Sequence, residues 1–124
     1  MPRKKKEKTR FTDKELGVFK NLIEKRLEKA RSELNYYLDQ LKEAASSADA
    51  KIKGLDDGNM TVENERVSNL AARQKKLIQH LENALIRIEN KAYGICRETG
   101  KLISKDRLKA VPHATLSIEA KQKR

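Results

Sequence analysis

The sequence predicts an all-α protein, a long antiparallel two-helix coiled-coil hairpin with a small globular base. Two long stripes of apolar residues, each repeating every three or four positions, predict the two helices. A short segment between the stripes is rich in glycine and aspartate, which favour turns, and it predicts the tip of the hairpin. A third segment, at the C-terminal end, has the spacing of a small zinc module with most of its ligands replaced, and it predicts the base.

The first helix is expected to begin just after Phe11. Thr12 and Glu15 are spaced as a capping box, in which each side chain bonds the other residue's backbone amide. A single narrow stripe of this kind is typical of a coiled-coil seam. The helix can end anywhere between Ala45 and Lys53. The stripe consists of Leu16, Phe19, Ile23, Leu27, Ala30, Leu34, Tyr37, Leu41 and Ala44.

The second helix carries a matching stripe, interrupted by Gln74 at a seam position. Thr61 is the predicted N-cap, because threonine can accept a bond from a free amide of the first turn. We expect the two helices to pair within one chain, as a monomer, and to span residues 11–91 with the tip near residues 54–60. The stripe consists of Val67, Leu70, Leu77, Leu81, Ala84 and Ile88.

Charge is concentrated at the two ends of the 124-residue chain, whose net charge is +11. Residues 1–10 hold six Lys or Arg and one Glu, and the last four residues hold three more basic side chains. We expect residues 1–10 and 122–124 to be disordered basic tails, because their low hydrophobicity cannot offset the entropy cost of ordering them. Such tails can add salt-sensitive affinity for phosphates without sequence specificity.

Several classes of protein are excluded by what the sequence lacks. A single cysteine allows no intrachain disulfide, and no apolar run is long enough for a signal core or a membrane span. The sequence has no phosphate-binding glycine loop, no H-E-x-x-H motif and no supported Ser, His and Asp arrangement. We therefore expect a cytoplasmic protein that is not an enzyme and has no membrane partner.

The C-terminal segment, residues 92–121, has the spacing of a zinc module with most of its ligands replaced. Cysteines at the positions of Cys96, Thr99, Ser117 and Ala120 would form two C-x2-C pairs separated by seventeen residues, the pattern of a four-thiolate zinc site. Only Cys96 can ligate. The segment is therefore predicted to be a degenerate zinc-finger-like base of treble-clef type, with no zinc and no other cofactor.

Apolar packing is expected to replace the metal in this base, with Thr99 and Ser117 close to Cys96 in a compact plug. Two alternatives for Cys96 remain open: a metal site shared with His113 and carboxylates, or a redox-sensing thiol. His80 is expected on the flank of the second helix rather than as a ligand. The expected core residues are Tyr93, Ile95, Leu102, Ile103, Leu108, Val111, Leu116 and Ile118, together with Phe11, Leu16 and Phe19.

Nine positions of this segment resemble the DksA/TraR family of C4-type zinc-finger transcription factors. They are Tyr93, Gly94, Cys96, Gly100, Arg107, Leu108, Ala110, Pro112 and Ala114. The resemblance is strongest from about Leu70 onward. It implies a regulator whose coiled coil enters the secondary channel of bacterial RNA polymerase, without sequence-specific contact to DNA.

The resemblance also implies a functional tip. Family members carry an Asp-x-x-Asp-x-Ala motif there, which works beside the catalytic magnesium of the polymerase. Counting back from Cys96 places Lys53, Asp56 and Gly58 at the three motif positions, and Asp57 can supply another acid. We therefore predict that Asp56, Asp57 and Gly58 form the functional tip. The alternative is an ordinary solvated turn.

Two further sets of positions follow from the resemblance. Arg73 stands where family members place an arginine against the rim of the polymerase. His80, Val111 and Lys121 stand where some members bind the alarmone guanosine tetraphosphate, and among these three only Lys121 is plainly basic.

The predicted function is direct regulation of transcription through RNA polymerase, with the alarmone as a further ligand. The alternative is a basic nucleic-acid- or ribosome-associated protein that binds through its Lys/Arg tails. A third interpretation is a coiled-coil scaffold that only oligomerises.

Overall fold

The computed structural model describes residues 10–51 and 58–122, with the side chains of residues 10–45 and 62–122. Most of both predicted tails and the predicted tip residues Asp56 and Asp57 lie outside the described residues. The described part is helical, with one isolated antiparallel bridge between Ile95 and Leu102 and no strand. This confirms the all-α fold class. No described helix has the length and apolar character needed to cross a membrane.

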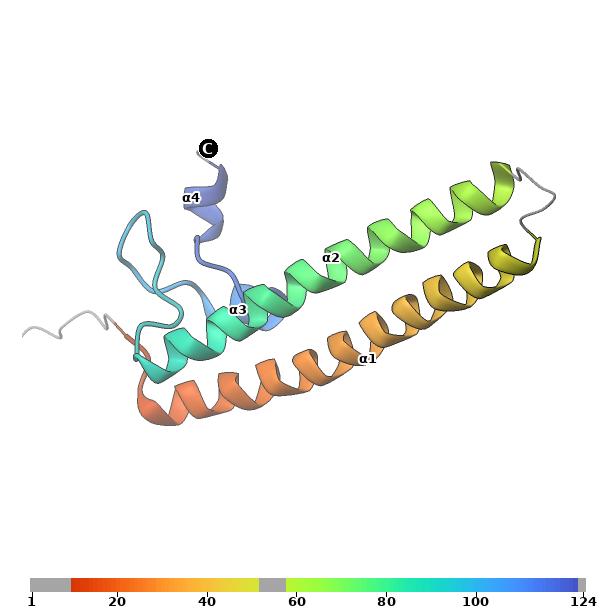
Figure 1. Cartoon of the computed structure of the whole chain (residues 1–124). Helices are drawn as coiled ribbons and strands as arrows, with labels where there is room; N and C mark the ends of the chain where they lie inside the picture. The colour runs from red at the N-terminus through yellow and green to blue at the C-terminus, as the bar shows by residue number, and fades with distance from the viewer. Residues whose placement is uncertain (1–9, 52–57, 123–124) are drawn as a thin grey trace, which may run out of the picture. The chain divides into compact units, whose positions relative to one another are not determined.

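Two long helices dominate the chain (Figure 1): α1 from Asp13 to Lys51 and α2 from Gly58 to Glu89. The end of α1 falls within the range that the sequence left open. Thr61 is the fourth residue of α2, so the predicted N-cap is wrong. The residues before it include aspartate and asparagine, which cap helices as well as threonine does, so the residue type alone did not select the start.

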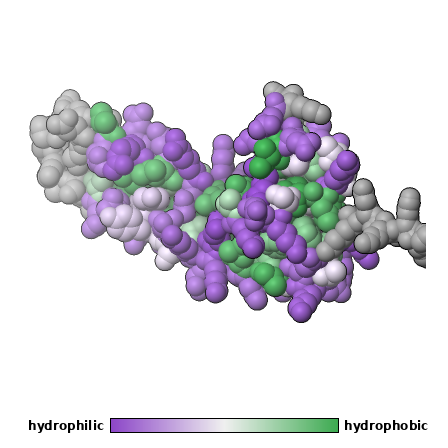
Figure 2. Space-filling model, turned by 180° about the vertical axis from the view of Figure 1, so that it is seen from behind, coloured by the Kyte–Doolittle hydropathy of each residue, from purple (hydrophilic) through white to green (hydrophobic). Residues whose placement is uncertain are grey.

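The chain forms two compact units. The first unit comprises Met1–Arg26 and His80–Arg124, and the second comprises Leu27–Gln79. The N-terminal part of α1 and the C-terminal part of α2 therefore belong to the same unit as the segment that follows α2. Hydrophilic residues cover most of the face shown in Figure 2, in keeping with the 38% of charged residues in the sequence.

In the second unit, α1 and α2 pair through small and aliphatic residues. Leu27, Ala30, Val67 and Ala71 are its buried side chains among those described. Gln74, the polar residue in the second stripe, donates hydrogen bonds from Nε2 to the carbonyl oxygen of Ala30 at 3.3 Å and to Oε1 of Glu33 at 2.9 Å. A polar residue that finds partners in only one alignment fixes the register of two helices.

In the first unit, α3 (Lys105–Ala110) and α4 (Ile118–Gln122) add a further layer to the ends of the long helices. Phe19 lies at the centre, with its ring 5.5 Å from that of Phe11 and 5.3 Å from that of Tyr93. The buried hydrophobic side chains of this unit are those of Phe11, Leu16, Phe19, Ile23, Leu81, Ala84, Ile88, Tyr93, Cys96, Ile103, Leu108, Ala114 and Ala120.

The expected core of the base is only partly observed. Tyr93, Ile103 and Leu108 are fully buried. Ile118 is 51% exposed, so its predicted place in the core is wrong. The reason is the short helix α4, which buries Ala120 instead. The remaining expected residues, Ile95, Leu102, Val111 and Leu116, are half-buried.

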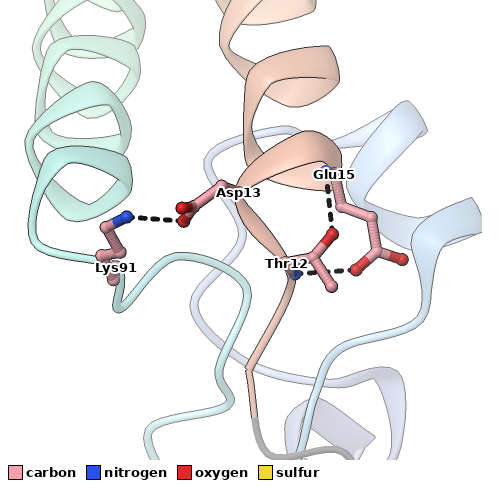
Figure 3. Close-up of polar contacts among 4 residues, drawn as sticks. All are labelled: Thr12, Asp13, Glu15 and Lys91. Atoms are coloured by element: carbon pink, nitrogen blue, oxygen red, sulfur yellow. Dashed lines mark hydrogen bonds and ion pairs between the residues drawn. The ribbon is translucent and has the colours of Figure 1, made fainter.

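A capping box and two ion pairs stabilise the start of α1 (Figure 3). The backbone amide of Thr12 donates to Oε1 of Glu15 at 2.8 Å, and the amide of Glu15 donates to Oγ1 of Thr12 at 3.2 Å, as a capping box requires. Lys91 pairs with Asp13, and Lys105 pairs with Glu15 at 2.7 Å. The hydrogen bond from Lys91 and its charge lower the pKa of Asp13. The predicted capping motif is thus present.

The backbone conformation and the packing of Gly94 explain why this motif position, next to Tyr93, holds a glycine. Its φ of +79° lies in the left-handed region, and a Cβ atom there would collide with the ring of Phe11. Only glycine meets both requirements, so Gly94 lets the ring of Phe11 pack onto the base.

Candidate functional site

The four former ligand positions lie around Cys96. The backbone amide of Ser117 donates to Cys96 Sγ at 3.4 Å, and the Ser117 hydroxyl lies 3.7 Å from the sulfur. The same hydroxyl accepts a bond from the amide of Ala120 at 3.1 Å, and Oγ1 of Thr99 accepts one from the amide of Lys101 at 3.2 Å. The structure therefore gathers a thiol, two hydroxyls and a methyl group at these positions.

The sulfur of Cys96 has an unusual electrostatic environment. Burial raises the pKa of the thiol, but hydrogen bonds from the Thr99 side chain and from the amides of Ser117, Thr99 and Glu98 together lower it to about 6. These donors stabilise a thiolate. Cys96 is nevertheless fully buried, and a thiol that solvent cannot reach is a poor target for oxidants.

A second cluster in the first unit surrounds a cavity of about 260 Å³. His80, Val111 and Lys121, the three positions at which the resemblance implies alarmone contacts, all line it. The other lining residues are Arg87, Arg107, His113, Ala114, Thr115 and Leu116. Among the described residues that form this lining, the charged ones are all cationic.

Arg87 and Arg107 were missed by the analysis of the sequence. Arg107 belongs to the recognised motif, which was the only sign of its importance, and nothing in the sequence connects Arg87 with it. Nε of Arg107 donates to the carbonyl oxygen of Leu116 at 2.8 Å, and Nη2 of Arg87 donates to that of His113 at 3.4 Å. These hydrogen bonds hold both guanidinium groups at the cavity and also stabilise the backbone that lines it. Burial lowers the pKa of Arg87.

Two more donors hold the same stretch of backbone. Nη2 of Arg26, on α1, donates to the carbonyl oxygen of Lys109 at 2.9 Å, and Nη1 lies 3.5 Å from that of Ala110. The Tyr93 hydroxyl donates to the carbonyl oxygen of Pro112 at 2.8 Å. Burial raises the pKa of Tyr93, which keeps this donor protonated. The cavity wall is therefore fixed from α1, from α2 and from the segment after α2.

The two histidines of the chain meet at this cavity. Their rings stack with centroids 5.4 Å apart and planes 7° from parallel. The pKa of His113 is lowered, first by burial and then by the neighbouring His80, Arg87, Arg107 and Arg26. His80 does lie on α2 as expected, but its stacking partner was not foreseen. Within the described residues, no three His, Cys, Asp or Glu side chains group to hold a metal, so the alternative metal site with His113 finds no support.

The remaining predicted positions belong to the long helices. Gly58 is the first residue of α2, and Asp56 and Asp57 lie outside the described residues. Arg73 is exposed on α2 in the second unit.

The class of protein follows from a comparison with family models. Residues 91–124 match the prokaryotic dksA/traR C4-type zinc finger. This is the segment that contains Cys96 and most of the cavity wall.

Relatives extend this match to most of the chain. The RNA polymerase-binding transcription factor DksA of Caulobacter vibrioides is 32% identical over 119 residues, which cover 91% of this chain and 78% of that protein. General stress protein 16O of Bacillus subtilis is 24% identical over 98 residues, 79% of this chain and 59% of that protein. The chain belongs to the DksA/TraR family, which confirms the resemblance.

A solved structure gives the same result for the fold. The transcription factor DksA2 from Pseudomonas aeruginosa superposes with a TM-score of 0.75 at 26% sequence identity, covering 87% of this chain and 81% of the other. The combination of a helical hairpin with a zinc-finger-type base is thus shared with this structure.

The prediction that the chain uses no cofactor is contradicted by the family match, because a C4-type zinc finger implies zinc binding. The prediction rested only on counting thiolates at four positions, whereas the family model matches the whole segment. The side chains at those positions, Cys96, Thr99, Ser117 and Ala120, supply one thiolate and do not fit a four-thiolate site.

Proposed function

We propose that the chain is a transcription regulator that binds RNA polymerase directly, without sequence-specific contact to DNA and without enzymatic activity of its own. The observation that carries this proposal is the relationship, over 91% of the chain, to a protein named as an RNA polymerase-binding transcription factor. Both the long helices and the base take part in that relationship. Such a partner implies action in the cytoplasm.

We further propose that the paired helices enter the secondary channel, with Asp56, Asp57 and Gly58 acting at the tip and Arg73 docking at the rim. The exposure of Arg73 leaves its guanidinium available for a partner. At an effective dielectric of about 20, two unit charges about 4 Å apart interact by roughly 4 kcal/mol. Acids near the catalytic magnesium can therefore alter the balance between polymerase complexes.

A transcription assay with purified components tests the tip. Asp56→Asn combined with Asp57→Asn is expected to abolish the effect on transcription while binding to polymerase stays near normal. The matched control is Asp39→Asn, an exposed acid on α1, which is expected to behave as the parent. Unchanged regulation by the double variant would refute the tip mechanism. A protein that acts through its basic tails would be indifferent to these changes and would bind with a steep salt dependence.

The cavity supports a second part of the proposal, binding of phosphate groups of guanosine tetraphosphate. His80, Val111 and Lys121 share its lining with Arg87 and Arg107, and arginine is well suited to phosphate. The cationic side chains of this lining suit the phosphoryl groups of the ligand, and we propose that the polymerase contacts the rest of it.

A further inference from the structure

We propose that the stacked His80 and His113 couple anion binding in the cavity to the uptake of a proton. The anion is a phosphoryl dianion, and His113, stacked on His80, takes up the proton when the anion enters. This inference rests on the proposed phosphate-binding role of the cavity and adds its regulation by pH.

The geometry supplies the site for the proton. His80 comes from α2 and His113 from the segment between α3 and α4, and their nearly parallel rings both line the cavity. In the part of the chain that the structure describes, the buried Nδ1 of His113 has no hydrogen-bond partner. A buried polar atom without a partner is costly, so a bound group that supplies one would be favoured.

The charges around the pair explain why a proton is resisted in the empty cavity. His80 and Arg87 face it from α2, Arg107 from α3 and Lys121 from α4. Arg26, on α1, adds a further positive charge near His113. Among the described lining residues there is no carboxylate. A proton added to His113 would therefore join a group of cations, and a dianion would reverse that balance.

The direction of the pH dependence follows from this balance. In the free protein burial and the surrounding cations hold the pKa of His113 below the ordinary histidine value of about 6.5. A bound dianion raises that pKa. Between the two values, binding takes up a proton and affinity increases as pH falls. Above both values the histidine is neutral in either state, and its contribution to affinity does not depend on pH.

Sulfate is a suitable probe, because it is a tetrahedral dianion whose own charge stays constant from about pH 5.5 to 8. The chain has two histidines, so their ring C–H signals can be followed individually by NMR in the full-length protein. His80→Gln and His113→Gln assign the two signals. Saturating sulfate is expected to raise the apparent pKa of His113 by about one unit or more, and sulfate affinity should increase up to about tenfold for each unit of falling pH.

The variants and controls separate the possible outcomes. His113→Gln should bind sulfate with an affinity that no longer follows pH, and its circular dichroism should match that of the parent. If that variant does not fold, the titration of the parent protein still decides the question. Sulfate binding without a change in the His113 pKa would overturn proton coupling and leave the phosphate role intact. No sulfate binding between about pH 5.5 and 8 would overturn both.

Discussion

The two compact units are built from the same pair of helices but bury very different cores. In the first unit, aromatic and aliphatic side chains such as Phe19, Tyr93 and Leu108 are almost fully enclosed. In the second, the buried residues are few, and large stripe residues such as Tyr37 and Leu41 stay half-exposed. Two helices cover only one face of each other, whereas a third layer closes the core. Stability should therefore concentrate in the first unit.

A pair of leucine truncations tests this difference directly. Leu108→Ala removes a fully buried side chain of the first unit and is expected to lower the free energy of unfolding by about 2–5 kcal/mol. Leu38→Ala removes a side chain of the second unit that is 39% exposed, and the loss should stay below about 1 kcal/mol. Urea unfolding monitored by circular dichroism measures both. Equal losses would mean that the units do not differ in stability.

Three glycines of the first unit sharpen the comparison by separating steric clash from backbone strain. Gly94→Ala meets the ring of Phe11 and also needs a positive φ, so it should cost most, about 2–3 kcal/mol. Gly100→Ala has the strained φ but open space, and about 1 kcal/mol is expected. Gly17→Ala lies on α1 in open space and should stabilise by about 0.5–1 kcal/mol. Thermal unfolding ranks the three, and any other order would contradict the role assigned to Gly94.

A pH dependence of stability is also expected to originate in the first unit. The folded state lowers the pKa of Cys96 to about 6, below the value of about 8.5 for a free thiol. The thiolate is favoured on folding, so its contribution is fully present above the unfolded pKa and is lost as pH falls toward 6. Urea midpoints should therefore rise between about pH 6 and 8.5.

Cys96→Ser is the control for this slope, because a hydroxyl does not titrate in this range. In that variant the rise above about pH 7 should vanish. A second slope, below about pH 6.5, should persist, since the lowered pKa of His113 also favours its neutral form in the folded state. A slope above pH 7 that survives in Cys96→Ser would exclude Cys96 as its source.

Local patterns in the sequence predicted the features that depend on neighbouring residues. The helical stripes and the capping box of Thr12 and Glu15 follow from short-range geometry. The predicted N-cap of α2, Thr61, was wrong because several residues before it can also cap a helix.

The cavity could not be predicted in the same way, because its residues meet only after folding. The bond from Arg87 to His113 spans 26 residues and that from Arg26 to Lys109 spans 83. No local period relates such positions. Only the family register placed His80, Val111 and Lys121 together, and it gave no indication that the two histidines stack. The prediction of no cofactor was wrong for a different reason. It considered only the four ligand positions, whereas the family match covers the whole segment.

Carbonyl oxygens in the stretch from Lys109 to Leu116 accept hydrogen bonds from side chains outside it, those of Arg26, Arg87, Tyr93 and Arg107. Exchanging an exposed side chain of this stretch removes none of these bonds. The exposed side chains of this stretch can therefore change, in evolution or by design, while the donors that hold its backbone are kept.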